Sequence, residues 1–199
     1  MRRSVRLNVV TLAYNSLEGV VAITAGVVAG SVALVGFGLD SVIELAASGT
    51  ALWRLHADVD PARRARSERV SLRIIGVLFL ALAAYVAYDA VRALALREAP
   101  SGSTVGIVLA ALSLLVMPLL ARAKRRVAFE MGSGALAAEA KQTSLCAYLS
   151  AILLGGLLVN AMLGWWWADP IAALAMVPII AREGLEGMQG RSACADDCC

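Results

Sequence analysis

The chain has 199 residues, a net charge of +3 and a hydrophobic fraction of 60%, with a mean hydropathy of +0.75. This composition is too apolar for a water-soluble domain of that length. The sequence therefore predicts an integral membrane protein whose surroundings are the lipid bilayer.

Taken in chain order, six apolar runs are each long enough to cross a hydrocarbon core of about 30 Å. They lie near residues 8–29, 31–53, 71–93, 105–121, 135–160 and 168–182. Asp169 and Pro170 are predicted as the N-cap and first position of the last helix. We predict an all-α integral membrane protein with six transmembrane helices in one domain over residues 1–190, followed by a tail over residues 191–199.

The Lys and Arg residues lie on alternate connections between these runs. They gather in the N-terminal segment, in residues 54–69 and in residues 122–126, whereas the other connections carry only Arg97. Because such residues accumulate on the cytoplasmic side, both termini are predicted to be cytoplasmic in a multi-pass protein of the cell membrane. The basic clusters are thereby explained without nucleic acid as a partner.

Two acidic residues, Asp40 and Glu44, interrupt the second apolar run. Their spacing of four places both carboxylates on one helix face. A charged side chain at that depth costs at least ~2.5 kcal/mol on insertion scales, so the pair indicates a cation site, a proton relay or both. The alternative is that hydrogen bonds to a neighbouring helix neutralise each acid.

The fifth run carries a second polar face formed by Glu139, either Gln142 or Thr143, and Cys146, whereas Lys141 and Ser144 lie off it. If this face meets the acid pair, oxygen donors and one sulfur come together. Such a set suits a borderline-soft divalent ion such as Zn²⁺ and tolerates Cd²⁺ or Co²⁺. The alternative for Cys146 is a small packing residue.

The first run contributes Asn15 and Glu18, three residues apart on one face. Asn15 is expected to support the site by hydrogen bonding between helices, and Glu18 either to line a polar cavity or to carry protons. The sequence contains no nucleotide-binding loop and no Ser/His/Asp or Cys/His arrangement, so we expect neither an enzyme nor a resident cofactor.

These features resemble the cation diffusion facilitator family over residues 5–190. The stretch SVALVGFGLDSVIELAASGTALWRL is similar to the second helix of these transporters, and AEAKQTSLCAYLSAILLGGLLVNAMLGWWWADPIAAL to their fifth helix, outer loop and sixth-helix start. The resemblance implies that Asp40 and Glu44 are the second-helix metal pair. It places Gln142 and Cys146 where the family usually has His and Asp, with Glu139 able to complete the metal site.

The resemblance further implies a homodimeric secondary transporter that exports a divalent heavy-metal ion, with Zn²⁺ expected and Cd²⁺ or Co²⁺ as alternatives, in exchange for protons. The competing interpretation is a membrane metal receptor or delivery partner that does not transport, because two fifth-helix ligands are changed. Members of the family commonly continue into a cytoplasmic domain. This chain is expected to be a short member with the transmembrane half only.

The tail contains Cys194, Cys198 and Cys199 and is predicted to capture thiophilic ions near the cytoplasmic mouth. Removing residues 192–199 is expected to raise the apparent KM at low free metal and leave the maximal rate nearly unchanged, because the tail acts by raising the local metal concentration. Metal uptake into inverted vesicles measures both quantities. A collapse of the maximal rate at unaltered KM would make the tail part of the fold or of the transport machinery.

Overall fold

The computed structural model describes residues 2–57, 61–131 and 134–189. Over these residues the chain forms six helices and no strand, which confirms the predicted all-α architecture. In chain order the helices are α1 (Arg2–Ala29), α2 (Val32–Ala57), α3 (Pro61–Leu96), α4 (Thr104–Met131), α5 (Gly134–Leu163) and α6 (Ala168–Met188).

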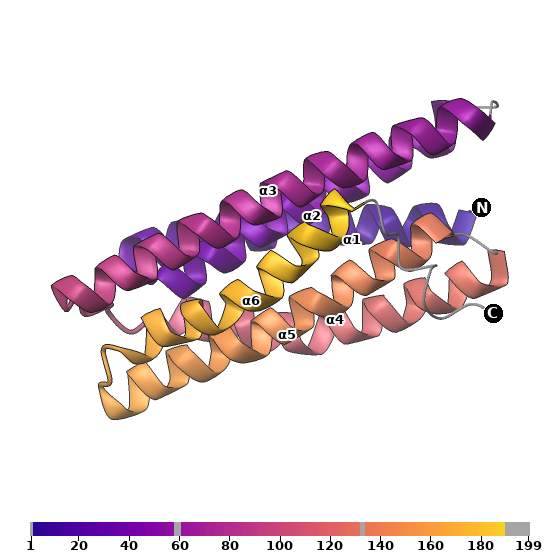
Figure 1. Ribbon diagram of the computed structural model, residues 1–199. Helices are drawn as coiled ribbons and strands as arrows, with labels where there is room; N and C mark the ends of the chain where they lie inside the picture. The colour runs from indigo at the N-terminus through magenta and orange to yellow at the C-terminus, as the bar shows by residue number, and fades with distance from the viewer. Residues whose placement is uncertain (1, 58–60, 132–133, 190–199) are drawn as a thin grey trace.

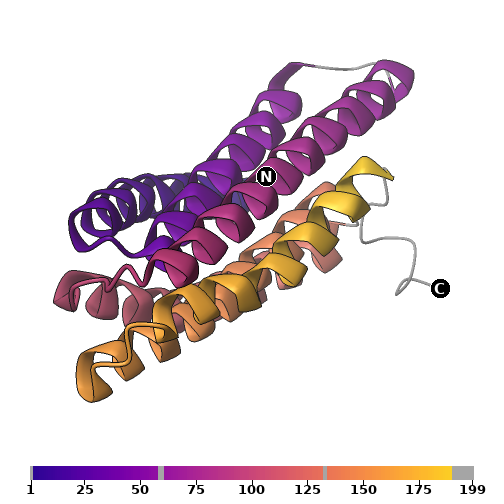
Figure 2. The ribbon, with the colours of Figure 1, turned by 60° about the vertical axis from the view of Figure 1, so that its left-hand side comes forward.

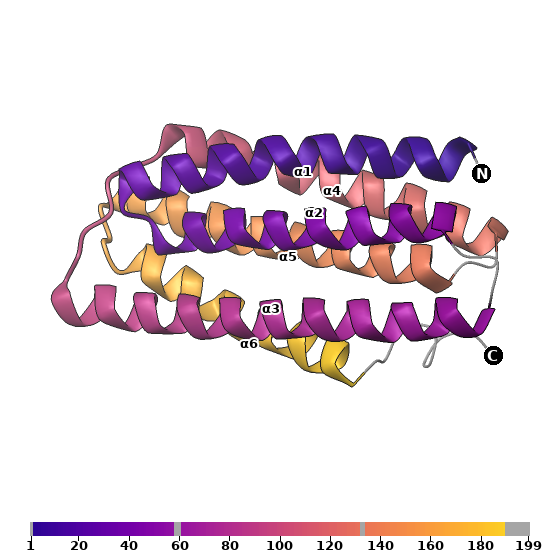
Figure 3. The same cartoon turned by 90° about the horizontal axis from the view of Figure 1, so that it is seen from above.

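The helices are arranged in two layers of three (Figures 1 and 3). One layer holds α1, α2 and α3, the other holds α4, α5 and α6, and each helix packs against its counterpart: α1 on α4, α2 on α5, and α3 on α6. The α3–α6 pair lies along one side of the bundle (Figure 2). In this arrangement α2 and α5 are the central helices, with neighbours on both sides and across the layers.

Five of the six described helices contain spans that are long and apolar enough to cross a membrane. These spans are Leu7–Ala29, Val32–Gly49, Leu72–Leu96, Thr104–Glu130 and Glu139–Leu163. The sixth helix has 21 residues that include Asp169, Arg182, Glu183 and Glu186, so its apolar portion is shorter than the others. The chain is a multi-pass membrane protein.

The central position of α2 makes it the most enclosed of these spans. In its most apolar window 67% of the residues are buried inside the bundle, against 33% for the spans of α1, α3 and α4. The outer helices expose large apolar side chains such as Leu17, Val28, Leu115 and Phe129. An apolar outer surface is what a lipid environment requires, and polar groups are then confined to the interior.

The buried Asp169 caps a different helix from the one predicted. The N-cap of α6 is Trp167, without a side-chain cap, and Asp169 lies in the first turn of α6. Ser31 Oγ donates to Asp169 Oδ1 at 2.5 Å, and the Ala33 N–H donates to Oδ2 at 3.4 Å. The prediction was wrong because an acidic side chain satisfies whichever helix N-terminus lies within reach, and here that is the start of α2.

Replacing Asp169 by Ala is expected to destabilise the protein by about 2 kcal/mol, since two hydrogen bonds to a buried carboxylate and a charge at a helix N-terminus are lost. Thermal unfolding in detergent, followed by circular dichroism, measures the change. The matched control is Asp89→Ala on α3, where a partly exposed carboxylate lies 3.8 Å from Arg92 and contributes little. Equal melting temperatures for the two variants would contradict the capping role.

Candidate cation site

Four helices turn buried polar side chains toward one another inside the bundle. On each helix these side chains form a row whose members recur at about the three- and four-residue spacing of a helix face. Their members are Asn8, Thr11, Asn15 and Glu18 on α1; Asp40, Ser41, Glu44 and Ser48 on α2; Ser113 and Lys124 on α4; and Glu139, Thr143, Cys146 and Ser150 on α5. Ionisable side chains inside membrane-spanning helices are costly and mark functional sites, so this interior is the candidate cation site.

Glu18 connects α1 to the three other helices of this interior. Its side chain is 1% exposed. Ser41 Oγ on α2 donates to Glu18 Oε2 at 2.9 Å, Ser113 Oγ on α4 donates to Oε1, and Cys146 Sγ on α5 lies 4.0 Å from Oε2. The sequence identified Glu18 as a polar group of this region, and the structure places it where all four helices meet.

Glu44 is the point at which α2 meets the polar face of α5. Thr143 Oγ1 lies 2.9 Å from Glu44 Oε1, whereas Oε2 has no hydrogen-bond partner among the described residues. The side chains of Asn15 and Cys146 also lie beside this carboxylate. The acid pair on α2 and the polar face of α5 are therefore adjacent, as a shared site requires.

Asp40 lies one turn before Glu44 and is also buried. It forms no hydrogen bond or ion pair with another described residue, and it lies within the electrostatic reach of Glu44, Glu18 and Cys146. Three carboxyl groups and one thiol thus share a buried region. In the part of the chain that the structure describes, no three His, Cys, Asp or Glu side chains stand close enough to hold one metal ion by themselves.

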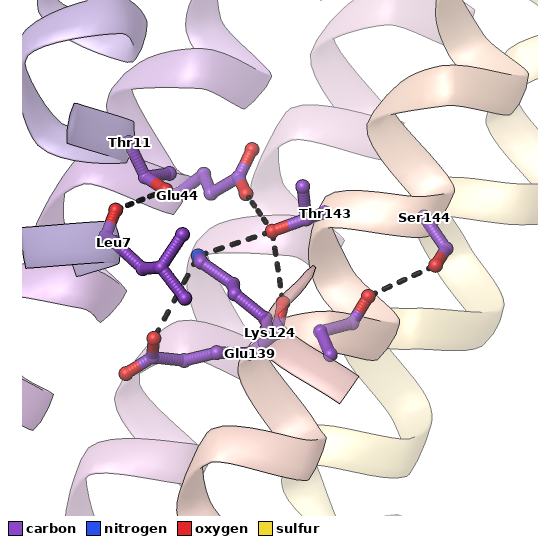
Figure 4. Close-up of polar contacts among 8 residues, drawn as sticks. Leu7, Thr11, Glu44, Lys124, Glu139, Thr143 and Ser144 are labelled. Carbon is purple, nitrogen blue, oxygen red and sulfur yellow. Dashed lines mark hydrogen bonds and ion pairs between the residues drawn. The ribbon is translucent and has the colours of Figure 1, made fainter. Parts of the chain in front are cut away.

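Thr143, rather than Gln142, occupies the buried position on α5 that the spacing left open. Its hydroxyl accepts from Lys124 Nζ at 3.2 Å and lies within donating distance of Glu44 Oε1 and of the Glu139 carbonyl oxygen, at 2.9 and 3.0 Å (Figure 4). Gln142 is only partly buried, and its Nε2 has no hydrogen-bond partner among the described residues.

Lys124 is a buried cation that the sequence-based topology assigned to a cytoplasmic cluster. Helix α4 continues beyond the predicted end of its span, and the side chain of Lys124 is 0% exposed. Its Nζ lies 3.7 Å from Glu139 Oε2 (Figure 4). Glu139, expected to complete a metal site, is therefore paired with an ammonium group in the structure.

The sequence does indicate that Lys124 is buried, through its spacing from other residues of α4, but a topology assigned only from the positions of Lys and Arg does not use that spacing. It continues a row of buried residues on α4 at the spacing of a helix face: Ala110, Ser113, Met117 and Ala121. If the helical periodicity of these buried positions had been extended past residue 121, where the fourth apolar run was predicted to end, it would have placed Lys124 in the interior of the bundle. The same test on α1 would have added Asn8 and Thr11 to the polar row.

Lys141 lies off the polar face of α5, as its position in the sequence predicted. Its side chain pairs with Glu183, at 3.9 Å, and with Glu186 on α6. The hydrogen bond from Lys141 holds the pKa of Glu186 below its usual value. These contacts stabilise the pairing of α5 with α6 at the edge of the bundle.

Comparison with known proteins gives the class to which this helix bundle belongs. The model of the cation efflux transmembrane domain matches residues 9–187. The chain therefore belongs to the cation efflux family of transmembrane metal cation transporters, which confirms the family resemblance seen in the sequence.

The magnetosome protein MamB of Paramagnetospirillum magneticum is 30% identical over 167 residues, which cover 81% of this chain and 56% of that protein. The chain thus spans little more than half the length of this curated relative.

The Lys124–Glu139 pair provides a test of how the interior is neutralised. Lys124→Met is expected to destabilise the protein by roughly 3 kcal/mol or more, because it removes the ammonium group that pairs with a buried carboxylate. The double variant Lys124→Met/Glu139→Gln is expected to recover most of that loss. Thermal unfolding in detergent measures both, and a double variant as unstable as the single one would show that Lys124 acts through other contacts.

Proposed function

We propose that this chain is a secondary transporter that exports a divalent heavy-metal cation from the cytoplasm in exchange for protons, with Zn²⁺ as the expected ion and Cd²⁺ or Co²⁺ as alternatives. One observation carries the proposal. Glu18, Asp40, Glu44 and Cys146 gather in the interior of helices long enough to cross a membrane, in a chain of the cation efflux family. Uncompensated carboxylates at that depth favour a bound cation or proton.

In this proposal Asp40 and Glu44 are the principal metal ligands. Cys146 supplies the soft donor that favours Zn²⁺ and Cd²⁺ over Mg²⁺ or Ca²⁺. Gln142 is a further oxygen donor one turn earlier on α5. Glu139 becomes a ligand only when it leaves Lys124, because the ammonium group and a metal ion compete for the same carboxylate.

Exchange follows from the chemistry of the ligands. A carboxyl group must lose its proton before it binds a metal ion, so metal and proton compete for the same oxygen atoms of Asp40 and Glu44. Movement of helices around this site would open it to each side of the membrane in turn.

The orientation and assembly are part of the same proposal. Six antiparallel helices return the chain to the side on which α1 begins (Figure 3). The distribution of Lys and Arg supports a cytoplasmic position for that side and for both termini. We further propose that the transporter works as a homodimer in the cell membrane.

Asp40→Asn and Glu44→Gln are each expected to abolish metal flux while the protein still folds, because both changes keep the side-chain size but remove the charge that a divalent ion requires. Uptake into inverted vesicles under an imposed pH gradient, with Zn²⁺, Cd²⁺, Co²⁺, Fe²⁺ and Mn²⁺ compared, measures flux and selectivity. Asp89→Asn on α3 is the matched control and is expected to transport normally. Wild-type flux in the Asp40→Asn/Glu44→Gln variant would remove the pair from the mechanism, and metal binding without flux would favour a receptor.

A further inference from the structure

Lys124 places a positive charge inside the candidate cation site. The apolar span Thr104–Glu130 of α4 includes this residue, and its side chain is 0% exposed. An ion pair is an expensive way to join two helices, because well-packed apolar side chains of similar volume often do so at no loss of stability. An ionisable group inside a membrane-spanning segment indicates a functional role instead.

The ion pair with Glu139 holds Lys124 only loosely. Its Nζ lies 3.7 Å from Glu139 Oε2, whereas a hydrogen bond between an ammonium group and a carboxylate is about 2.7–2.9 Å long. The ammonium group has three donors and is carried on a flexible four-carbon chain. Lys124 can therefore interact with Glu139 and with a second acceptor group.

Thr143 connects Lys124 to the acid pair of α2. Lys124 Nζ donates to Thr143 Oγ1 at 3.2 Å, and the same hydroxyl lies 2.9 Å from Glu44 Oε1 (Figure 4). Because its oxygen accepts from Lys124, the single hydroxyl proton of Thr143 can be donated to Glu44. Lys124 also lies within the electrostatic reach of Glu44. The ammonium group thus contacts Glu139 directly and Glu44 through one hydroxyl group.

We infer that Lys124 is the resident counter-ion of the cation site, which stabilises the Glu44 carboxylate while the site is empty and weakens its hold on a bound divalent cation. This inference rests on the proposed function and adds to it the residue that sets the affinity for the ion. Lys124 is a positioning residue, because it acts on the ion only through Glu44 and Thr143.

The arrangement explains how a buried carboxylate can bind an ion and still release it. Like charges repel, so a cation at Glu44 drives the ammonium group toward Glu139, and the ammonium group regains Glu44 when the ion leaves. A transported ion must bind strongly enough to enter its site and weakly enough to leave it. A tethered positive charge that replaces the departing ion meets the second requirement.

The test uses the full chain with Zn²⁺ as the probe. Calorimetry in detergent gives the Kd, and uptake into inverted vesicles gives the KM and the maximal rate. The variant Lys124→Met/Glu139→Gln leaves the net charge of the interior unchanged and is expected to fold, because the ammonium group and its carboxylate are removed together. Its Zn²⁺ Kd is expected to be about tenfold lower than that of the wild type, since a unit charge a few ångströms from Glu44 is lost.

The transport kinetics separate this role from helix packing. In Lys124→Met/Glu139→Gln the KM and the maximal rate are both expected to fall, because an ion that binds more tightly leaves more slowly. Glu139→Gln alone is expected to raise the Kd about tenfold, because Lys124 then turns its charge toward Glu44. If Glu139 were itself a ligand in the resting site, both variants would bind Zn²⁺ more weakly, and the inference would be wrong.

The matched control is Lys141→Met/Glu186→Gln. It also removes one Lys–Glu pair without changing the net charge, but this pair joins α5 to α6 at the edge of the bundle. The control is expected to keep the wild-type Kd. An equally tight Kd in the control would show that the gain does not depend on the position of Lys124, and would overturn the inference.

The outcomes also separate this inference from the proposed function. If Asp40→Asn/Glu44→Gln loses Zn²⁺ while Lys124→Met/Glu139→Gln binds no more tightly than the wild type, the counter-ion role is overturned and the transporter proposal stands. If the wild-type chain neither binds nor transports a divalent ion, both fail. If Lys124→Met/Glu139→Gln does not fold, Lys124→Gln takes its place, because its amide can still donate to Thr143, and a Kd no lower than that of the wild type overturns the inference.

Discussion

The central constraint on this molecule is that charged groups placed inside an apolar bundle must be neutralised there. Lipid offers no hydrogen bonds and little screening, so each carboxylate requires a proton, a hydrogen-bond donor or a cation from the protein or from a ligand. The buried interior contains Glu18, Asp40, Glu44 and Glu139 but only Lys124 as a resident cation among the described side chains. These buried groups lie on α1, α2, α4 and α5, which face one another inside the bundle.

The interior divides into two parts with different partners. At one end Lys124 and Glu139 form an ion pair, and Thr143 connects the ammonium group to Glu44. Beyond this pair, Glu18 is held by hydroxyl groups and Asp40 has no partner among the described residues. The first part joins α4 to α5, and the second leaves carboxyl groups that have no resident cation beside them and must hold a proton or bind a cation from outside the chain.

The two-layer arrangement makes these two parts of the interior possible, because α2 and α5 are the central helices. Helix α2 packs against α1 and α5, and α5 packs against α2 and α4, so the buried polar side chains of these helices face one another. The outer helices can then expose apolar side chains to lipid. The Asp169 carboxylate of α6 also caps the start of α2. Helix α2, which carries the acid pair, is thus held at its N-terminal end by Asp169 of α6 and near its middle by the hydrogen bond between Glu44 and Thr143 of α5.

Much of this protein could be predicted from the local sequence. Helix formation, span length and the faces shared by Asp40 with Glu44 and by Glu139 with Cys146 depend on residues a few positions apart, and helical periodicity determines them directly. Only the tertiary structure decided which helices are neighbours. That choice buries Lys124 beside Glu139, turns Asp169 toward α2, selects Thr143 over Gln142 and brings Asn15 to Glu44, because each of these contacts joins residues far apart in the chain whose partners no local pattern specifies.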